Sequence, residues 1–140
     1  MREVSNKAFA VIRAICTQLE VPLSELCAGL TTPEEAEKEG LEWNVFCELA
    51  ERLSARCGSH EELAKQGACA VSVPELGPAI GILRTVAGVR GLLWANFKWG
   101  GPSLFRVVTT NFYERNDGTC VGSISIPEPH RECVPIYYLC

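Results

Sequence analysis

Apolar side chains recur every three or four residues along the first part of the chain, the spacing of a helix with one buried face. Over residues 5 to 19 this pattern predicts an amphipathic helix that begins after Ser5, a residue type suited to capping. A proline at its start and a glycine beyond its end predict a second, short helix over residues 21 to 28. The capping box that opens at Thr32 predicts a brief acidic helix that ends at Gly40 and connects elements at the surface.

The apolar stripe returns over residues 43 to 57 and predicts a buried helix that stops at Gly58. Ser54 is the one polar residue that borders this stripe. A second capping box opens at Ser59, and it places His60 at the surface in the first turn of the next helix. A catalytic role for His60 is therefore disfavoured.

The stretch before the strands is predicted to hold two more helices. Residues 76 to 87 have a wide apolar face, which predicts the first of them. Gly88 breaks the pattern, and the second helix is predicted over residues 89 to 97. The sequence Gly100-Gly101-Pro102 is expected to end that helix, because glycine weakens a helix interior and proline removes a backbone donor.

Residues on either side of Asn116-Asp117-Gly118 alternate between apolar and polar, which predicts a β-hairpin. With Gly118 in the left-handed position, Arg115 faces Thr119 and Gly122 faces Phe112, where the missing side chain leaves room for the ring. This register is favoured because a shift by one residue would split the apolar set between faces. The predicted buried face holds Val108, Phe112, Cys120, Ile124 and Ile126.

These elements predict an α+β fold in which the helical N-terminal two-thirds pack on a C-terminal antiparallel β-hairpin. Pro135 restricts the last element to a helix that starts there or to an edge strand. An isolated hairpin is marginal in water, and the sequence stops at Cys140 within an apolar run. Residues 1–140 are therefore expected to be one domain, truncated at its C-terminal end or completed by strands of a second copy.

Composition excludes several classes of protein. With 47% hydrophobic and 21% charged residues, the chain is globular in type, and its apolar stretches are interrupted by charges, so no membrane span is expected. No secretory signal opens the sequence, which predicts a cytoplasmic protein. The net charge of −4 comes from the N-terminal half, and basic residues do not cluster, so this domain is not expected to bind nucleic acid.

The chain contains eight cysteines but no C-x-x-C spacing, and its two histidines lie far apart. Zinc and iron-sulfur sites are therefore disfavoured, and the cysteines are predicted to be reduced and structural. For catalysis, Cys133 lies three residues from His130, the closest approach of a nucleophile and a base in the sequence. Phosphate-binding glycine signatures are absent. No catalytic residue, metal ligand or cofactor is assigned, and an enzyme is the disfavoured class.

Aromatic residues are dense just before and within the hairpin. They are predicted either to pack as core or to line a largely apolar ligand pocket of about 300 Å³ or more. The residues assigned to this candidate ligand site are Trp94, Phe97, Trp99, Phe105 and Phe112.

Four stretches carry a resemblance to a known family: residues 43 to 46, 51 to 53, 98 to 105, and the hairpin to Cys133. In these stretches the chain resembles the N-terminal sensory domains that precede histidine-kinase modules in bacterial signalling proteins. It is also similar to the N-terminal domains of AraC-type regulators and, more distantly, to heme/NO-binding sensors. Heme is not expected here, because neither histidine lies on an apolar helical face.

The resemblance implies a non-catalytic sensory input domain for a histidine kinase or a transcription regulator. Its expected partners are a small apolar ligand and either a downstream signalling domain or a second copy. The alternative is a protein-interaction or dimerisation module that uses the open hairpin edge or the last helix. A small thiol enzyme using Cys133 and His130 is the third and least favoured class.

Overall fold

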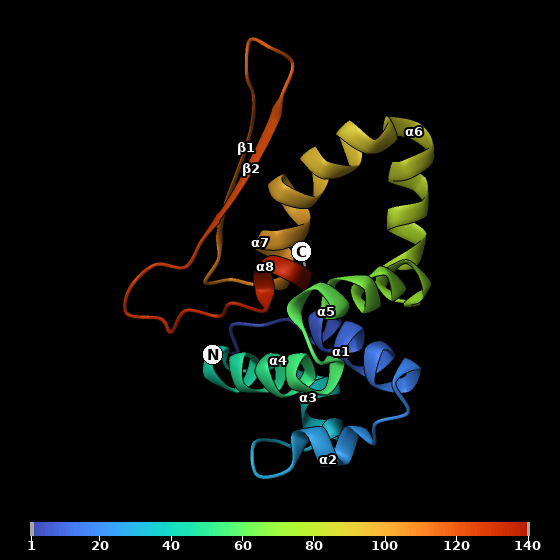
Figure 1. Cartoon of the computed structure of the whole chain (residues 1–140), viewed down its shortest axis with the longest axis vertical. Coiled ribbons are helices and arrows are strands. Elements are labelled where there is room, and N and C mark those ends of the chain that lie inside the picture. Colours follow the sequence, from blue (N-terminus) through green and yellow to red (C-terminus); the bar gives the residue numbers. More distant parts are fainter. Residues whose placement is uncertain (1, 140) are drawn as a thin grey trace.

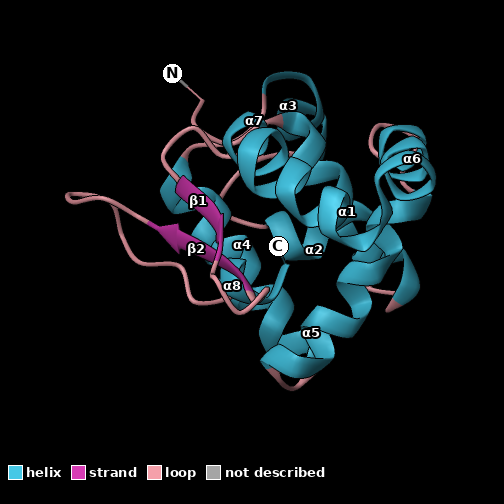
Figure 2. Cartoon of the chain, turned by 90° about the horizontal axis from the view of Figure 1, so that it is seen from above, coloured by secondary structure: helices cyan, strands magenta, loops and turns pink. Residues whose placement is uncertain are grey.

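The computed structural model describes residues 2–139, and within this range it leaves out the side chains at positions 70, 71, 77, 83, 84, 86 and 89. Helices dominate the chain, and one antiparallel hairpin follows them along one side of the molecule (Figures 1 and 2). The α+β class predicted from the sequence is therefore confirmed. The α-helices are α1 (Asn6–Gln18), α2 (Leu23–Cys27), α3 (Pro33–Glu39), α4 (Trp43–Cys57), α5 (His60–Gly67), α6 (Gly77–Ala95), α7 (Gly101–Leu104) and α8 (Ile136–Leu139). The other elements are the 3₁₀ turn η1 (Ala68–Ser72), the π-helical turn η2 (Asn96–Gly100), and the strands β1 (Thr109–Glu114) and β2 (Cys120–Ser125).

The predicted caps are the observed helix starts. The hydroxyls of Ser5, Thr32 and Ser59 accept hydrogen bonds from backbone N–H groups at 3.2, 3.2 and 3.1 Å. Gly58 ends α4 in the left-handed conformation, with φ of 89°. Local sequence alone determines these boundaries, because the groups that a helix end leaves unpaired are satisfied within a few residues.

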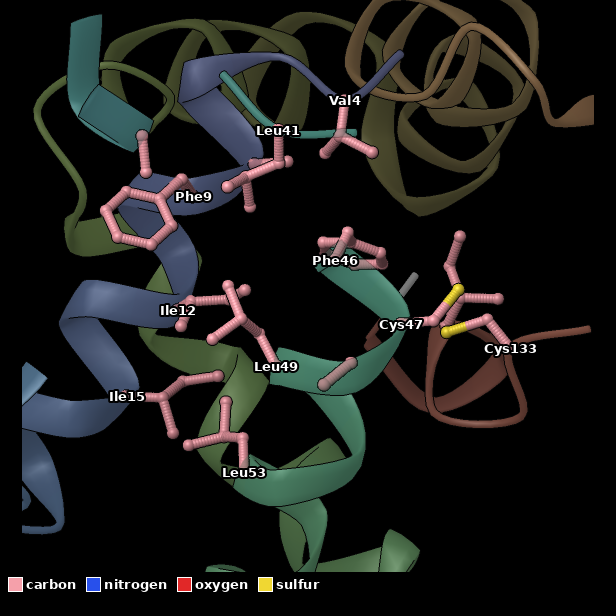
Figure 3. Packing of buried hydrophobic residues seen from close by; sticks show 14 of the residues in the cluster. Val4, Phe9, Ile12, Ile15, Leu41, Phe46, Cys47, Leu49, Leu53 and Cys133 are labelled. Carbon is pink, nitrogen blue, oxygen red and sulfur yellow. The ribbon is translucent and has the colours of Figure 1, made fainter. Parts of the chain in front are cut away.

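The main core lies between α1 and α4. Phe9, Ile12 and Ile15 of α1 face Leu49 and Leu53 of α4, and all are fully buried (Figure 3). Val4 extends this core by pairing its backbone with Leu41 and Phe105. The N-terminal segment at Val4 thus joins the helical half to the segment that leads into the hairpin.

Helix α6 is an arch with two helical arms (Figure 1). Its corner is Gly88, whose φ of 65° and ψ of −174° lie outside the helical range. This is the break that the sequence predicted. The second arm, however, does not end at Gly100-Gly101-Pro102, which is a correction to the sequence-based expectation.

The helical path runs through the two glycines and the proline to Leu104, by way of the π-helical turn η2. In this turn the N–H of Gly101 reaches back five residues to the carbonyl of Asn96. Pro102 has no N–H for the next carbonyl, that of Phe97, and the hydroxyl of Thr110 on β1 donates to it instead. A side chain far along the sequence therefore satisfies the group that makes proline unfavourable inside a helix.

The hairpin has the predicted register. Thr109 pairs with Ser125 and Phe112 with Gly122, and Gly118 in the turn has φ of 82°. Two details differ from the prediction. The ring that occupies the space over Gly122 is that of Phe97 from η2, which would collide with any side chain there, and it stacks on Phe112 at 5.9 Å.

The apolar face of the hairpin is also less covered than predicted. Val108 is buried, but Phe112, Ile124 and Ile126 are only half-buried. The reason is that the helices contact the hairpin mainly near its base through η2 and α7, whereas its distal end extends away from them (Figure 1). Arg90 of α6 reaches Glu114 near that end and forms an ion pair with it.

After the hairpin, the chain packs against α4, and its last described element is the helix α8. The sequence allowed a helix or an edge strand here, and the helix is correct. The indole Nε1 of Trp43 donates to the carbonyl of Arg131 at 2.7 Å, and the Arg131 guanidinium donates to both oxygens of Glu51 at 2.7 Å. These contacts fasten the C-terminal segment to the first three turns of α4. None of the helices described between residues 2 and 139 is both long and apolar enough to cross a bilayer.

Candidate functional site

A largely apolar cavity of about 420 Å³ lies between α1 and the segment that runs from the arch of α6 through η2 to α7. This volume falls within the range of ordinary ligand pockets, about 300–1,000 Å³. Its walls come from elements far apart in sequence, because the arch of α6 leads away from the core and returns to it. The apolar lining residues are Ala8, Val11, Ile12, Phe46, Leu76, Ala79, Ile80, Leu92, Ala95, Trp99, Leu104, Phe105 and Leu139.

Of the aromatic residues assigned to the ligand site from sequence, Trp99 and Phe105 line this cavity. Trp94, Phe97 and Phe112 do not. Trp94 packs edge-on against Trp99, with ring centroids 4.7 Å apart, and Phe97 and Phe112 stack on each other between η2 and the hairpin. The five rings therefore do not enclose one space, because η2 directs Trp99 and Phe97 to different neighbours.

Aliphatic residues of α1 and α6 form a large part of the apolar cavity wall, and the sequence reasoning missed them as site residues. Their helical spacing marked them as buried, and nothing in that spacing distinguishes a core position from a pocket position. The one local signal was Gly88, because a helix broken between two apolar faces bends and leaves space on its inner side.

Four polar side chains also reach the cavity: Lys7, Glu75, Asn96 and Ser103. Glu75 accepts a hydrogen bond from Arg13 at 3.0 Å. Its pKa is lowered by hydrogen bonding to its own backbone N–H and by the Arg13 guanidinium, so Glu75 is ionised and paired near neutral pH.

The second pocket, of about 360 Å³, is polar and lies beside the N-terminus of α1. Arg2, Lys38, Glu39 and Arg106 line it, together with Ser103, which is shared with the apolar cavity. Arg2 is already paired with Glu35 and lies 3.6 Å from Glu39. This pocket is therefore an open surface hollow in which three cations, Arg2, Lys38 and Arg106, lie with one carboxylate, that of Glu39.

The structure does not bring Cys133 and His130 together as a catalytic pair. Nε2 of His130 lies 3.5 Å from Glu3, and its Nδ1 lies 3.2 Å from the carbonyl of Pro127. The Cys133 thiol, fully buried, instead faces the thiol of Cys47 across the α4 surface (Figure 3). The hydrogen bond between the two thiols raises the pKa of Cys47 and lowers the pKa of Cys133, the latter against the effect of burial. Because His130 is held by other partners, this geometry does not give Cys133 a base.

The described cysteines are free thiols, and Cys140 lies outside the described residues. Burial raises the pKa of Cys16 to about 11, which suppresses its reaction in the native state. We expect Cys57 and Cys120, which are half-buried, to be alkylated by iodoacetamide faster than Cys16, Cys47 and Cys133. Peptide mass spectrometry after timed labelling measures this order, and early labelling of Cys133 would contradict it. Denatured, unreduced protein should label at all eight cysteines.

His60 lies in the first turn of α5, as its capping box predicted, but it is half-buried instead of freely exposed. Its Nδ1 lies 2.8 Å from the hydroxyl of Ser54, and its ring stacks on Tyr138 with centroids 4.9 Å apart. Ser54 is buried, so it needs this partner. His60 thus joins α4, α5 and α8, and the signal for it was Ser54 at the border of an apolar stripe.

Within residues 2–139, no three His, Cys, Asp or Glu side chains lie close enough together to hold a metal ion. Comparison of the chain with protein-family models, with curated proteins and with solved structures gives no match.

Proposed function

We propose that this chain is a non-catalytic sensory input domain of a bacterial signal-transduction protein, attached to a histidine kinase or a transcription regulator. In this proposal a small apolar ligand occupies the cavity between α1 and the arch of α6. The observation that carries it is the cavity itself, of ligand size and lined mainly by aliphatic and aromatic side chains with a few polar groups.

The position of η2 supports a sensory role, because this turn touches both the cavity and the hairpin. Trp99 and Gly100 line the cavity. Phe97, in the same turn, lies over Gly122 and Phe112, and its carbonyl accepts from Thr110. A ligand that binds one arrangement of η2 more tightly than another would shift the equilibrium toward that arrangement, and the hairpin would move with η2. The difference in affinity for the two arrangements sets the size of the shift.

Binding of octan-1-ol, followed by titration calorimetry, tests this proposal. Val11→Phe places a ring in the cavity from α1 and is expected to weaken octanol binding at least about tenfold, because the space is filled. Gln18→Phe adds the same ring at an exposed position of α1 and should leave binding unchanged. Equal binding by both variants would show that the cavity is not the site.

One observation favours the dimerisation module as a second candidate. In the described part of the chain, β1 and β2 pair only with each other, so both outer edges of the hairpin are open, and Tyr113 is 52% exposed beside one of them. Sedimentation velocity across a range of concentrations would detect a dimer, and Tyr113→Lys should weaken it. A kinase or DNA-binding module encoded after Cys140 would favour the input domain, whereas a stop codon there would favour self-assembly.

A further inference from the structure

We infer that the ligand of the cavity is an apolar monocarboxylate whose carboxylate lies at Lys7 and whose hydrocarbon or aryl tail lies between α1 and α6. This inference rests on the proposed function, because it concerns the same cavity. Three features carry it: the charges at the cavity wall, the position of the polar groups at one end, and the available volume.

Of the residues that the structure describes, two charged side chains line the cavity, Lys7 and Glu75. The carboxylate of Glu75 is held by Arg13 at 3.0 Å, and Arg13 also pairs with Glu37 at 2.9 Å. Among the same residues, no carboxylate lies within 4.0 Å of the Lys7 ammonium group. An anionic head group at this end of the cavity therefore gains from meeting Lys7.

Two of the other polar groups, Ser103 and Asn96, lie near Lys7, whereas Glu75 lies with Arg13. The N–H of Ser5 donates to the carbonyl of Leu104 at 2.8 Å, which places the first turn of α1 beside α7 and Ser103. The hydroxyl of Ser103 donates to the carbonyl of Gly100 at 2.9 Å, and the side chain of Asn96 packs beside Gly100. Because the Ser103 proton is already used, the donors left for a carboxylate are the Lys7 ammonium and the Asn96 amide.

Between Lys7 and the ion pair of Glu75 with Arg13, the cavity wall is apolar. Arg13, which holds Glu75, lies six residues beyond Lys7, about 9 Å along the axis of α1. Between them α1 contributes Ala8, Val11 and Ile12 to the wall, and α6 contributes Ala79, Ile80 and Leu92 opposite. The cavity thus has a polar end and an apolar body, the arrangement that fits a ligand with one charged head and one apolar tail.

The volume limits the size of the ligand. At the roughly 30 Å³ that one water molecule takes in the liquid, about 420 Å³ accommodates on the order of ten to fourteen non-hydrogen atoms. Straight-chain acids near octanoate and small aryl-alkyl acids fall in this range. An amine of the same length would place its charge beside Lys7 and be repelled, and an alcohol would gain only the tail contacts.

The test compares octanoate, octan-1-ol and octylamine by titration calorimetry at pH 7.5, at which the acid is ionised and the amine protonated. The wild-type protein is expected to bind octanoate at least about tenfold more tightly than octanol, and octylamine more weakly than either. Lys7→Met should remove the preference for octanoate over octanol, and Lys7→Arg should retain it. The Lys7→Met change keeps the backbone N–H that Ser5 caps.

Lys98→Met is the matched control, because Lys98 is exposed on η2 and does not line the cavity. It should bind all three compounds as the wild type does. If octanol binds but octanoate binds no more tightly, or if Lys7→Met keeps the preference, the monocarboxylate inference is overturned while the proposed function stands. If neither octanol nor octanoate binds, the proposed function fails and the inference fails with it.

Discussion

Replacing Trp43 by alanine is expected to lower the free energy of unfolding by about 3–5 kcal/mol, the usual cost of removing a large aromatic ring from a core. Trp43 is 1% exposed and packs against Phe46 and Phe105, with ring centroids 5.8 and 6.4 Å away. Its Nε1 also donates to the carbonyl of Arg131 at 2.7 Å. The substitution therefore opens a cavity beneath Phe105 and loosens the C-terminal segment from α4.

Urea denaturation followed by far-ultraviolet circular dichroism measures this loss. Trp94→Ala is the control, because Trp94 is 41% exposed on α6, and its loss should cost less than about 1.5 kcal/mol. Trp43→Phe separates the two contributions, since it keeps most of the packing and removes the hydrogen bond. Equal losses for Trp43→Ala and Trp94→Ala would mean that the core is not centred on Trp43.

Sequence reasoning succeeded wherever the physical cause is local. The hairpin register follows from alternation over a few residues and from Gly118, and a slip by one residue would expose the apolar set. The starts of α3 and α5 follow from Thr32 and Ser59, whose hydroxyls bind N–H groups three residues ahead. In these cases the partners lie within one turn, so the sequence contains the whole interaction.

The predictions that failed did so because a residue distant in sequence changes the structure that a local pattern predicts. The local sequence predicts that Pro102 ends a helix, but Thr110 supplies a donor for the carbonyl of Phe97 and the helical path continues. The local sequence predicts that His60 is exposed, but its contacts with Ser54 and Tyr138 leave it half-buried. Neither partner can be identified without knowing how the elements are placed in space.

The candidate site was only partly predictable for the same reason. Aromatic density drew attention to the segment that contains Trp99 and Phe105, which line a cavity of about 420 Å³. This is not the predicted cavity, because the five rings do not enclose one space. Lys7, however, lies more than ninety residues before Trp99, and its pattern in the sequence is that of any exposed helical lysine. Lys7 lines the cavity because α1 and α7 lie next to each other in the fold.

The second large effect is expected at Gly40, where replacement by alanine should cost more than about 3 kcal/mol. Gly40 has φ of 80° and ψ of −163°, a conformation that costs other residues about 1–3 kcal/mol. A Cβ there would also collide with the carbonyl oxygen of Val4, which already accepts the N–H of Leu41 at 2.9 Å. Relieving that collision shifts backbone, at a further cost of about 1–3 kcal/mol.

Gly29→Ala separates strain from collision. Gly29 has a similar φ of 77°, but a Cβ on it would meet no atom within 4 Å, so its replacement should cost only about 1–2 kcal/mol. Since Val4 also pairs with Phe105 in the cavity wall, Gly40→Ala should weaken octanol binding as well, whereas Gly29→Ala should not. Urea midpoints and octanol titrations of both variants measure these differences. Equal costs for the two variants would show that the contact between Gly40 and Val4 does not hold the N-terminal segment in place.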